Sequence, residues 1–386
     1  MLQQVHRRRL RIAQVAPLYE SVPPKLYGGT ERVVAYLAEE LIRRGHEVTL
    51  FASGDSTASA KIQAFSATAL RAAGLVPWGS SLHLPMLSEV FENAARFDVI
   101  HCHLDYWSFP FARMITTPAV TTLHGRLDIP QLFGVYRYYS DAPVISISDA
   151  QREPLPELNW VGTVQHGLPA SQLRFHPGPG KYLAFLGRIA PEKRVDLAIE
   201  VAARCKVPLK IAAKVDAVDR EYFESQIRPL LGTEGIEFIG EISEREKSDF
   251  LGNAIALLFP VDWPEPFGLV MIEALACGTP VIARPCGSVP EVLREAVTGF
   301  MASSVDGLVD AVQRISSVSR EQCRAEFETR FTASVMAANY ERIYCQLIDN
   351  RRIRTGQNGG RPASEISGGI AVSEDARPTL GDIETA

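Results

Sequence analysis

The chain has 386 residues, and its 40 Lys and Arg against 45 Asp and Glu give a formal net charge of −5. This length suits two domains better than one core, and the near balance of charge gives no reason to expect a nucleic-acid partner. No apolar run approaches the roughly 20 residues that a membrane span needs. The segment Met1–Arg9 lacks the apolar core of a signal peptide, which favours a cytoplasmic protein over an exported one.

The first part of the chain, residues 1–170, alternates predicted strands and helices. Leu10–Ala16 predicts a strand, apolar residues then recur at helical spacing from Val33 to Ile42, and Glu47–Ala52 predicts the next strand. Three more strands are expected further along, at Phe97–His101, Ala119–Leu123 and Pro143–Ser146. This order is typical of a parallel, doubly wound α/β domain.

The side chains that follow these strands are polar or aromatic. His101 and His103 lie two positions apart, but they are too few ligands for a zinc site, so we expect one of them to face a cleft. Asp105, Tyr106 and Trp107 either line that cleft or pack beneath a loop.

A Pro- and Gly-rich linker over residues 167–180 separates this region from a second alternation of strands and helices. The pattern predicts a second Rossmann-like domain over residues 175–330. Its expected elements are Tyr182–Leu186, Val195–Ala203, Leu209–Ala213, Ile236–Ile239, Ala254–Phe259 and Pro280–Ala283. The predicted fold class is therefore α/β, with two doubly wound domains.

The end of the chain divides into a helix and a tail. Residues 331–350 carry Met336, Tyr340 and Tyr344 at helical spacing, and we expect this helix to pack back on the first domain. Residues 352–386 are rich in Gly, Ser, Arg, Glu and Pro, a composition typical of disorder.

Six cysteines are scattered along the chain without a CxxC pair or a metal-ligand spacing. We expect them to be reduced thiols, as in a cytosolic protein. They are Cys102, Cys205, Cys277, Cys286, Cys323 and Cys345.

Two carboxylates eight positions apart form the most informative motif. Glu273 lies in an otherwise apolar helical run, where a buried carboxylate needs a partner, so it faces either solvent or a polar ligand. Glu265 lies in the turn before that helix, whose first backbone N–H groups belong to Phe267, Gly268 and Leu269. Carboxylates accept hydrogen bonds from sugar hydroxyls, and a pair of them also suggests glycoside hydrolysis.

Two further segments contain groups that suit a phosphate. Gly28-Gly29-Thr30 lies between the first strand and the first helix, where glycines and a helix N-terminus favour an anion, although a plain turn is an alternative. Arg188 and Lys193 occupy the matching place in the second domain, where they would bind a diphosphate or form a solvated surface loop. A hydrolase would not need such a phosphate site.

On these motifs the chain resembles glycosyltransferase family 4 over roughly residues 10–348. The motifs occur in the family's order and at the corresponding strand ends. They are Gly28-Gly29-Thr30-Glu31, Gly187-Arg188 with Glu192-Lys193, the pair Glu265 and Glu273, Ala276-Cys277-Gly278-Thr279-Pro280, and Pro290-Glu291-Val292 with Thr298-Gly299-Phe300.

The resemblance implies the GT-B fold of two facing Rossmann-like domains. It also implies a retaining reaction that moves a hexose from a nucleotide sugar, with UDP-glucose the favoured donor, to a hydroxyl of a saccharide, lipid or small metabolite. No metal or other cofactor is implied. A peripheral membrane contact through Arg7, Arg8 and Arg9 stays open, since three charges contribute modestly.

The resemblance implies a role for each matching residue. Catalytic roles fall to Glu265, Arg188, Lys193 and His124, the last touching the 6-hydroxyl of the donor sugar. The donor-binding set is Gly28, Gly29, Arg188, Lys193, Ile239, Glu265, Phe267, Gly268, Leu269 and Glu273. In that set Arg188 and Lys193 bind the diphosphate, Glu273 binds the ribose, and the backbone around Ile239 meets the base.

The chain departs from the family pattern at four places. Arg194 stands where a glycine is common, His166 stands where an asparagine is common, and Cys286-Gly287-Ser288 replaces paired glycines. Lys214 follows two alanines where a Gly-rich turn is usual, and this departure leaves open whether it contacts a phosphate.

Two alternative functions share this architecture. One is a nucleotide-sugar epimerase of the same fold. The other is a sugar-nucleotide-binding protein without catalysis.

Overall fold

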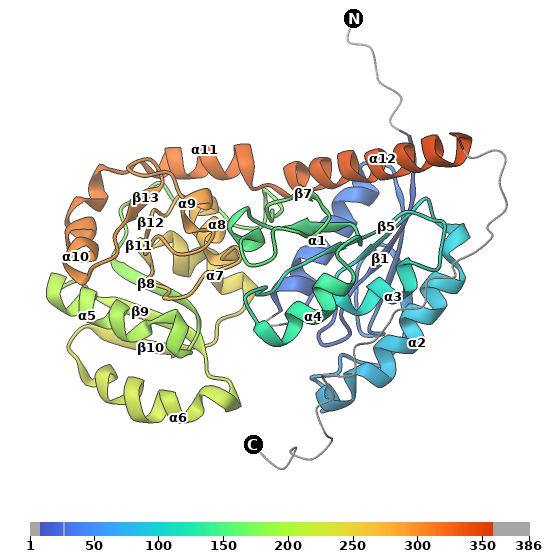
Figure 1. Ribbon diagram of the computed structural model, residues 1–386. Helices are drawn as coiled ribbons and strands as arrows, with labels where there is room; N and C mark the ends of the chain where they lie inside the picture. The colour runs from blue at the N-terminus through green and yellow to red at the C-terminus, as the bar shows by residue number, and fades with distance from the viewer. Residues whose placement is uncertain (1–7, 26–27, 358–386) are drawn as a thin grey trace, which may run out of the picture. The chain divides into compact units, whose positions relative to one another are not determined.

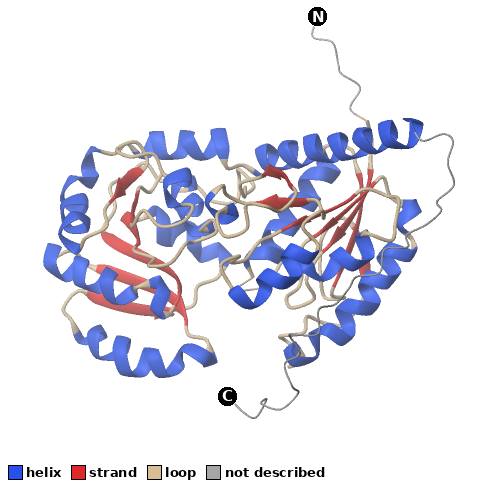
Figure 2. Cartoon of the chain, in the orientation of Figure 1, coloured by secondary structure: helices blue, strands red, loops and turns tan. Residues whose placement is uncertain are grey.

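The computed structural model describes residues 8–25 and 28–357. Arg7 and the predicted tail from residue 358 onward lie outside the described residues. The strands form two separate parallel sheets with helices around each (Figures 1 and 2). This arrangement confirms the predicted α/β fold with two Rossmann-like domains.

The first sheet has seven strands in the order β3-β2-β1-β4-β5-β6-β7. Its first six positions follow the order 3-2-1-4-5-6 of a doubly wound dinucleotide fold. The bounds are β1 Arg11–Val15, β2 Glu47–Ala52, β3 Lys61–Ala64, β4 Val99–Cys102, β5 Ala119–Thr122, β6 Val144–Ser146 and β7 Trp160–Thr163. The edge strands β3 and β7 were not predicted, because their residues are half-buried or exposed and lack a continuous apolar run.

The second sheet has six strands in the order β10-β9-β8-β11-β12-β13. Central strand β11 is buried along nearly its whole length, as its apolar sequence requires in a sheet covered on both faces. The bounds are β8 Tyr182–Arg188, β9 Leu209–Lys214, β10 Ile236–Gly240, β11 Ala254–Phe259, β12 Val281–Ala283 and β13 Gly299–Met301.

The helices cover the faces of these sheets (Figure 2). Those that matter most for the site are α1, which begins at Gly29, and α8, which begins at Leu269. The bounds are α1 Gly29–Arg43, α2 Gly79–Glu92, α3 Phe109–Ala112, α4 Pro130–Tyr138, α5 Val195–Cys205, α6 Arg220–Tyr222, α7 Glu244–Gly252, α8 Leu269–Ala276, α9 Val289–Val292, α10 Val305–Arg314, α11 Arg320–Arg330 and α12 Ala333–Gln357.

The chain crosses between the two sheets twice, and the two crossings pair with each other. The amide of Leu168 donates to the carbonyl of Phe331 at 2.9 Å, and the amide of Ala333 donates to the carbonyl of Leu168 at 2.7 Å. The linker predicted at residues 167–180 is therefore tied at its start to the returning segment.

Helix α12 follows the second crossing and packs on the first sheet. Its buried Met336, Tyr340 and Tyr344 share one hydrophobic cluster with Leu10 and Ile12. The helix continues to Gln357, so residues 352–357, which composition assigned to the tail, are helical. Arg and Gln are good helix formers, and composition alone does not locate where a helix ends.

Candidate functional site

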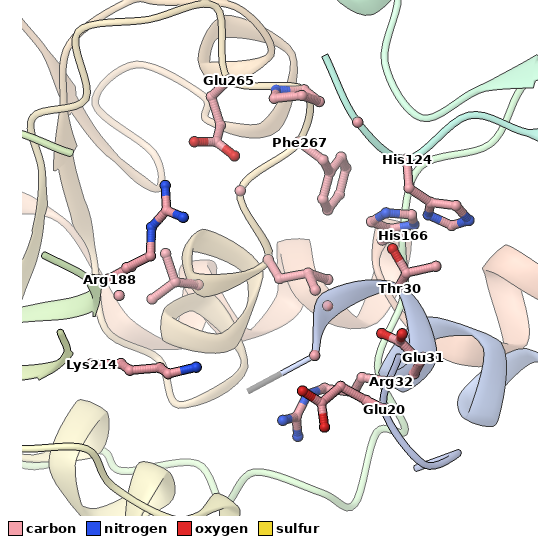
Figure 3. Close-up of a pocket in the computed structure, with 18 of the residues that line it drawn as sticks. Glu20, Thr30, Glu31, Arg32, His124, His166, Arg188, Lys214, Glu265 and Phe267 are labelled. Carbon is pink, nitrogen blue, oxygen red and sulfur yellow. The ribbon is translucent and has the colours of Figure 1, made fainter. Parts of the chain in front are cut away.

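A cavity of about 710 Å³ lies where the carboxyl ends of strands from both sheets meet. Ligands in open α/β folds bind at this edge. Its walls come from the start of α1, the loops after β4 and β5, the ends of β8 and β9, and the turn before α8 (Figure 3).

The N-termini of two helices open into this cavity. A Cβ atom built on Gly29, the first residue of α1, would lie 3.6 Å from Cδ1 of Leu269, the first residue of α8. Gly268 precedes α8 with φ 78°, a left-handed conformation that favours glycine. The two helix starts therefore lie close together, and the backbone N–H groups that a helix start leaves without intrahelical partners favour an anion.

Glu265 is held in place by the turn after β12. The amide of Ser288 donates to the carbonyl of Glu265 at 2.9 Å, and the Ser288 hydroxyl donates to the carbonyl of Phe267 at 2.9 Å. Gly287 has φ 57°, and a Cβ there would lie 2.4 Å from the amide nitrogen of Glu265. The turn can approach Glu265 this closely only because residue 287 is a glycine.

The two predicted diphosphate residues are both paired with carboxylates. Lys193 Nζ lies 2.5 Å from Glu265 Oε2, so the predicted phosphate and sugar contacts touch each other. Arg188 Nη2 lies 2.7 Å from Glu192 Oε1, with Asp216 and Asp219 at 3.8 and 3.7 Å. An anionic ligand at this place would compete with these carboxylates for the two cations.

Glu273 is buried, and its partner is a lysine. Lys247 of α7 donates from Nζ to Glu273 Oε1 at 2.7 Å, which answers the question of how an apolar helix carries a carboxylate. Lys247 also pairs with Glu244, whose Oε1 lies 2.6 Å from Arg32 Nη1 of α1. Burial alone would raise the pKa of Glu244, but Lys247 and Arg32 outweigh it and lower that pKa. This ion chain joins the two halves of the cavity wall.

The wall contributed by the first sheet contains neutral imidazoles. Burial lowers the pKa of His124 to about 3 and the pKa values of His103 and His166 well below their ordinary value. His124 Nε2 and His103 Nδ1 are 2.8 Å apart, and His103 Nε2 lies 2.8 Å from Gln14 Oε1. Since the Gln14 oxygen can only accept, His103 donates from Nε2, and His124 must then donate to its Nδ1.

Two carboxyl groups on the same wall are protonated more readily than usual. Burial raises the pKa of Glu31 to about 7 and that of Asp105 to about 6. Asp105 and Trp107 line the cavity, whereas Tyr106 packs edge-on against Tyr136 with ring centroids 5.8 Å apart. Of the two alternatives expected for this segment, Asp105 and Trp107 line the cavity, and Tyr106 packs against the protein.

The cavity brings together every predicted site residue except Ile239. Ile239 is 37% exposed and does not line the cavity, which is reached from this segment by Glu241 and Ile242. The residues gathered at the cavity are Gly28, Gly29, His124, Arg188, Lys193, Glu265, Phe267, Gly268, Leu269 and Glu273. Lys214 lines it too and pairs with Asp216 at 2.9 Å.

Sequence reasoning missed three residues that the structure places among these groups. Arg32, Lys247 and Trp263 line the cavity and contact Glu244, Glu273 and Glu265 respectively. Trp263 stands two positions before Glu265, a closeness that could have drawn attention to it. Arg32 directly follows Glu31, but its partner Glu244 lies far along the chain. Lys247 lies 26 positions from Glu273, so neither pairing could be seen in the sequence.

The described residues contain no group of three or more His, Cys, Asp or Glu side chains placed to hold a metal ion. His101 is buried, with Nδ1 2.6 Å from the Tyr344 hydroxyl and Nε2 2.7 Å from Thr122 Oγ1. The six cysteines are free thiols, and burial raises the pKa of Cys277 and Cys323 to about 12. In the described part of the chain, no helix combines the length and apolar character required to cross a membrane.

Comparison with known families gives two matches that together span most of the chain. The model "Glycosyltransferase Family 4" matches residues 27–153, and the model "Glycosyl transferases group 1" matches residues 172–330. The first match covers the α1 side of the cavity and the second covers the side that contains Glu265 and Glu273.

Individual relatives agree with these matches. A phosphatidyl-myo-inositol mannosyltransferase of Mycobacterium leprae is 28% identical over 87% of this chain and 96% of its own length. Sucrose-phosphate synthase from Thermosynechococcus elongatus has a similar structure, with a TM-score of 0.71, 20% identity, and coverage of 89% of this chain and 100% of that one. HepE of Anabaena, solved in complex with UDP-glucose, gives a TM-score of 0.67 at 16% identity over 89% of this chain and 100% of that one. The likeness of these structures shows the GT-B fold.

Proposed function

The chain belongs to glycosyltransferase family 4, and from that premise we propose that it is a retaining hexosyltransferase that moves glucose from UDP-glucose to a hydroxyl acceptor. The observation that supports this proposal most is the composition of the cavity. Arg188, Lys193 and the N-termini of α1 and α8 line the cavity together with Glu265 and Glu273. A nucleotide sugar carries both the anion and the hydroxyls that such groups bind.

The diphosphate of the donor would bind between Arg188, Lys193 and the first N–H groups of α8. Cleavage of the bond at the anomeric carbon leaves negative charge on this diphosphate, and preorganised positive groups stabilise that charge as it develops. Arg188 and Lys193 already lie at this place, paired with Glu192 and Glu265, and the diphosphate would compete with these carboxylates for the two cations. No bound metal is required for this step.

The ribose would bind Glu273 and the hexose would bind Glu265. Each carboxylate can accept hydrogen bonds from neighbouring hydroxyls. His124 has a pKa near 3, so it would meet a sugar hydroxyl as a neutral hydrogen-bonding group rather than as an acid. In the front-face reaction that we propose, the departing phosphate takes the proton of the acceptor hydroxyl, and no protein group needs to be the nucleophile.

The choice of glucose and uridine draws on the resemblance and on the UDP-glucose complex of HepE. The name of the mannosyltransferase relative makes mannose the second candidate sugar. A thermal-shift screen with UDP-glucose, UDP-galactose, ADP-glucose and GDP-mannose separates these possibilities. We expect a selective rise in melting temperature with UDP-glucose; a selective rise with GDP-mannose would replace the donor, and no rise with any of them would overturn the proposal.

A second experiment tests the reaction itself. The protein is incubated with the selected donor and a panel of saccharide, lipid and small-molecule acceptors, with and without EDTA, and release of the nucleotide is followed. We expect acceptor-dependent release that EDTA does not change, and an α-linked product by proton NMR. Interconversion of the sugar nucleotide without acceptor would indicate an epimerase, and binding without turnover would indicate a non-catalytic protein.

A further inference from the structure

Trp263 contacts both of the charged residues at the centre of the cavity. Its indole Nε1–H donates to Glu265 Oε2 at 2.8 Å, and Lys193 donates to the same oxygen at 2.5 Å. Within the part of the chain that the structure describes, no hydrogen bond is made to the other carboxylate oxygen, Oε1. Glu265 is thus held through one oxygen and has the other available to a ligand.

Two positively charged side chains lie over the face of the Trp263 ring. Lys193 Nζ lies 4.8 Å from the ring centroid, a distance at which an ammonium is attracted to an aromatic face. The guanidinium of Arg126, from the loop after β5, lies 5.2 Å from the same centroid. Trp263 therefore contacts residues from both sides of the cavity.

Lys193 has two competing anionic partners once a donor is present. It pairs with Glu265 in the described structure, and the diphosphate would attract it as well. If Lys193 turns toward the phosphate, Glu265 loses its charged partner while it stays buried, which is costly for a carboxylate. The hydrogen bond from the indole N–H of Trp263 is then the contact to Glu265 that remains.

We infer that Trp263 is a positioning residue that fixes Glu265 through Oε2, so that Oε1 meets the hydroxyls of the donor sugar while Lys193 moves to the diphosphate. This inference rests on the proposed function. It assigns Trp263 to recognition of the sugar and not to recognition of the nucleotide. The two parts of the donor can therefore be tested separately.

The test compares W263F with the wild-type protein by calorimetric titration with UDP and with UDP-glucose. Phenylalanine keeps an aromatic face for Lys193, although a smaller one, and lacks the N–H donor. We expect the Kd for UDP to stay within about twofold and the Kd for UDP-glucose to rise roughly tenfold or more, the usual effect of losing a hydrogen bond to a charged group. The melting temperature of each variant is measured to check that the fold is kept.

A double variant tests whether Trp263 acts through Glu265. In an E265A background, W263F should cause no further change in the Kd for UDP-glucose, because the group that it positions is already absent. Additive losses, equal weakening of UDP and UDP-glucose, or an unchanged Kd for both ligands in W263F would overturn the inference. If the wild-type protein binds UDP but not UDP-glucose, or neither, the proposed donor fails first and the inference falls with it.

Discussion

The two sides of the cavity are built on different electrostatic principles. On the side of the second sheet, the basic side chains Arg188, Lys193 and Lys247 each pair with a carboxylate. On the side of the first sheet, burial keeps His124 neutral and raises the pKa of Glu31 to about 7. Ion pairs dominate on the second-sheet side, whereas desolvation dominates among the buried groups of the first-sheet side except at Arg32, which pairs with Glu244. A charged donor would suit the second-sheet side, and an uncharged hydroxyl acceptor would suit the first-sheet side.

The largest effect should come from removing a charge on the second-sheet side. We expect K193A to lower the rate of transfer from UDP-glucose by roughly 10²–10³-fold, the usual loss when one group that stabilises the developing anion is removed. The exposed Lys181, which lies outside the cavity, provides the matched control K181A. Initial rates of nucleotide release measure both variants, and a K193A rate close to that of K181A would contradict the role of Lys193.

Substitution of Glu273 should weaken binding of the nucleotide more than binding of the sugar. We expect E273Q to weaken UDP binding about tenfold, because a neutral amide accepts weaker hydrogen bonds from the ribose and leaves Lys247 without a charged partner in α8. E200Q, at an exposed position of α5, is the control. Calorimetric titration with UDP measures the effect, and an unchanged Kd in E273Q would exclude the ribose contact.

The raised pKa of Glu31 on the first-sheet side should make the free energy of unfolding depend on pH. Burial raises the pKa of Glu31 from 4.5 to about 7, so the unfolded chain loses this proton first and the folded protein loses stability as pH rises through 7. E31Q cannot ionise, so its free energy of unfolding should exceed that of the wild type by up to about 3 kcal/mol at pH 8, and this excess should shrink toward pH 5. Urea unfolding at both pH values measures it. The exposed E92Q should show no such pH-dependent difference.

The smallest expected effect concerns two residues in the left-handed conformation, Arg194 with φ 53° and Lys206 with φ 55°. Glycine relieves the strain of that conformation, so K206G should raise the free energy of unfolding by about 0.5–1 kcal/mol. R194G should raise it less, because Arg194 also pairs with Asp196 and Asp262 at 2.9 and 3.1 Å. Equal gains in urea unfolding would show that these ion pairs contribute nothing.

The sequence predicted the second-sheet side of the cavity better than the first. Glu265 and Glu273 could be located because a helix N-terminus and an apolar run surround them in the chain, and both patterns are local. The left-handed φ of Arg194 likewise gives a reason for the glycine that is common at that position in the family. Ile239 was placed by resemblance alone, and it lies away from the cavity lining.

The first-sheet side depends on contacts that no local pattern records. His103, Gln14 and His124 come from three different strands or strand ends, and their hydrogen bonds form only when the sheet brings them together. Glu31 reads as an ordinary residue in the first turn of a helix, where a carboxylate is favourable. Its burial, and with it the raised pKa, follows from tertiary packing.

A crystal structure of the complex with UDP-glucose tests the central claim most directly. The account predicts the diphosphate between Arg188, Lys193 and the N-terminus of α8, the ribose on Glu273, and the glucose on Glu265. Electron density for the nucleotide elsewhere on the protein, or no density in this cavity at saturating UDP-glucose, would contradict it.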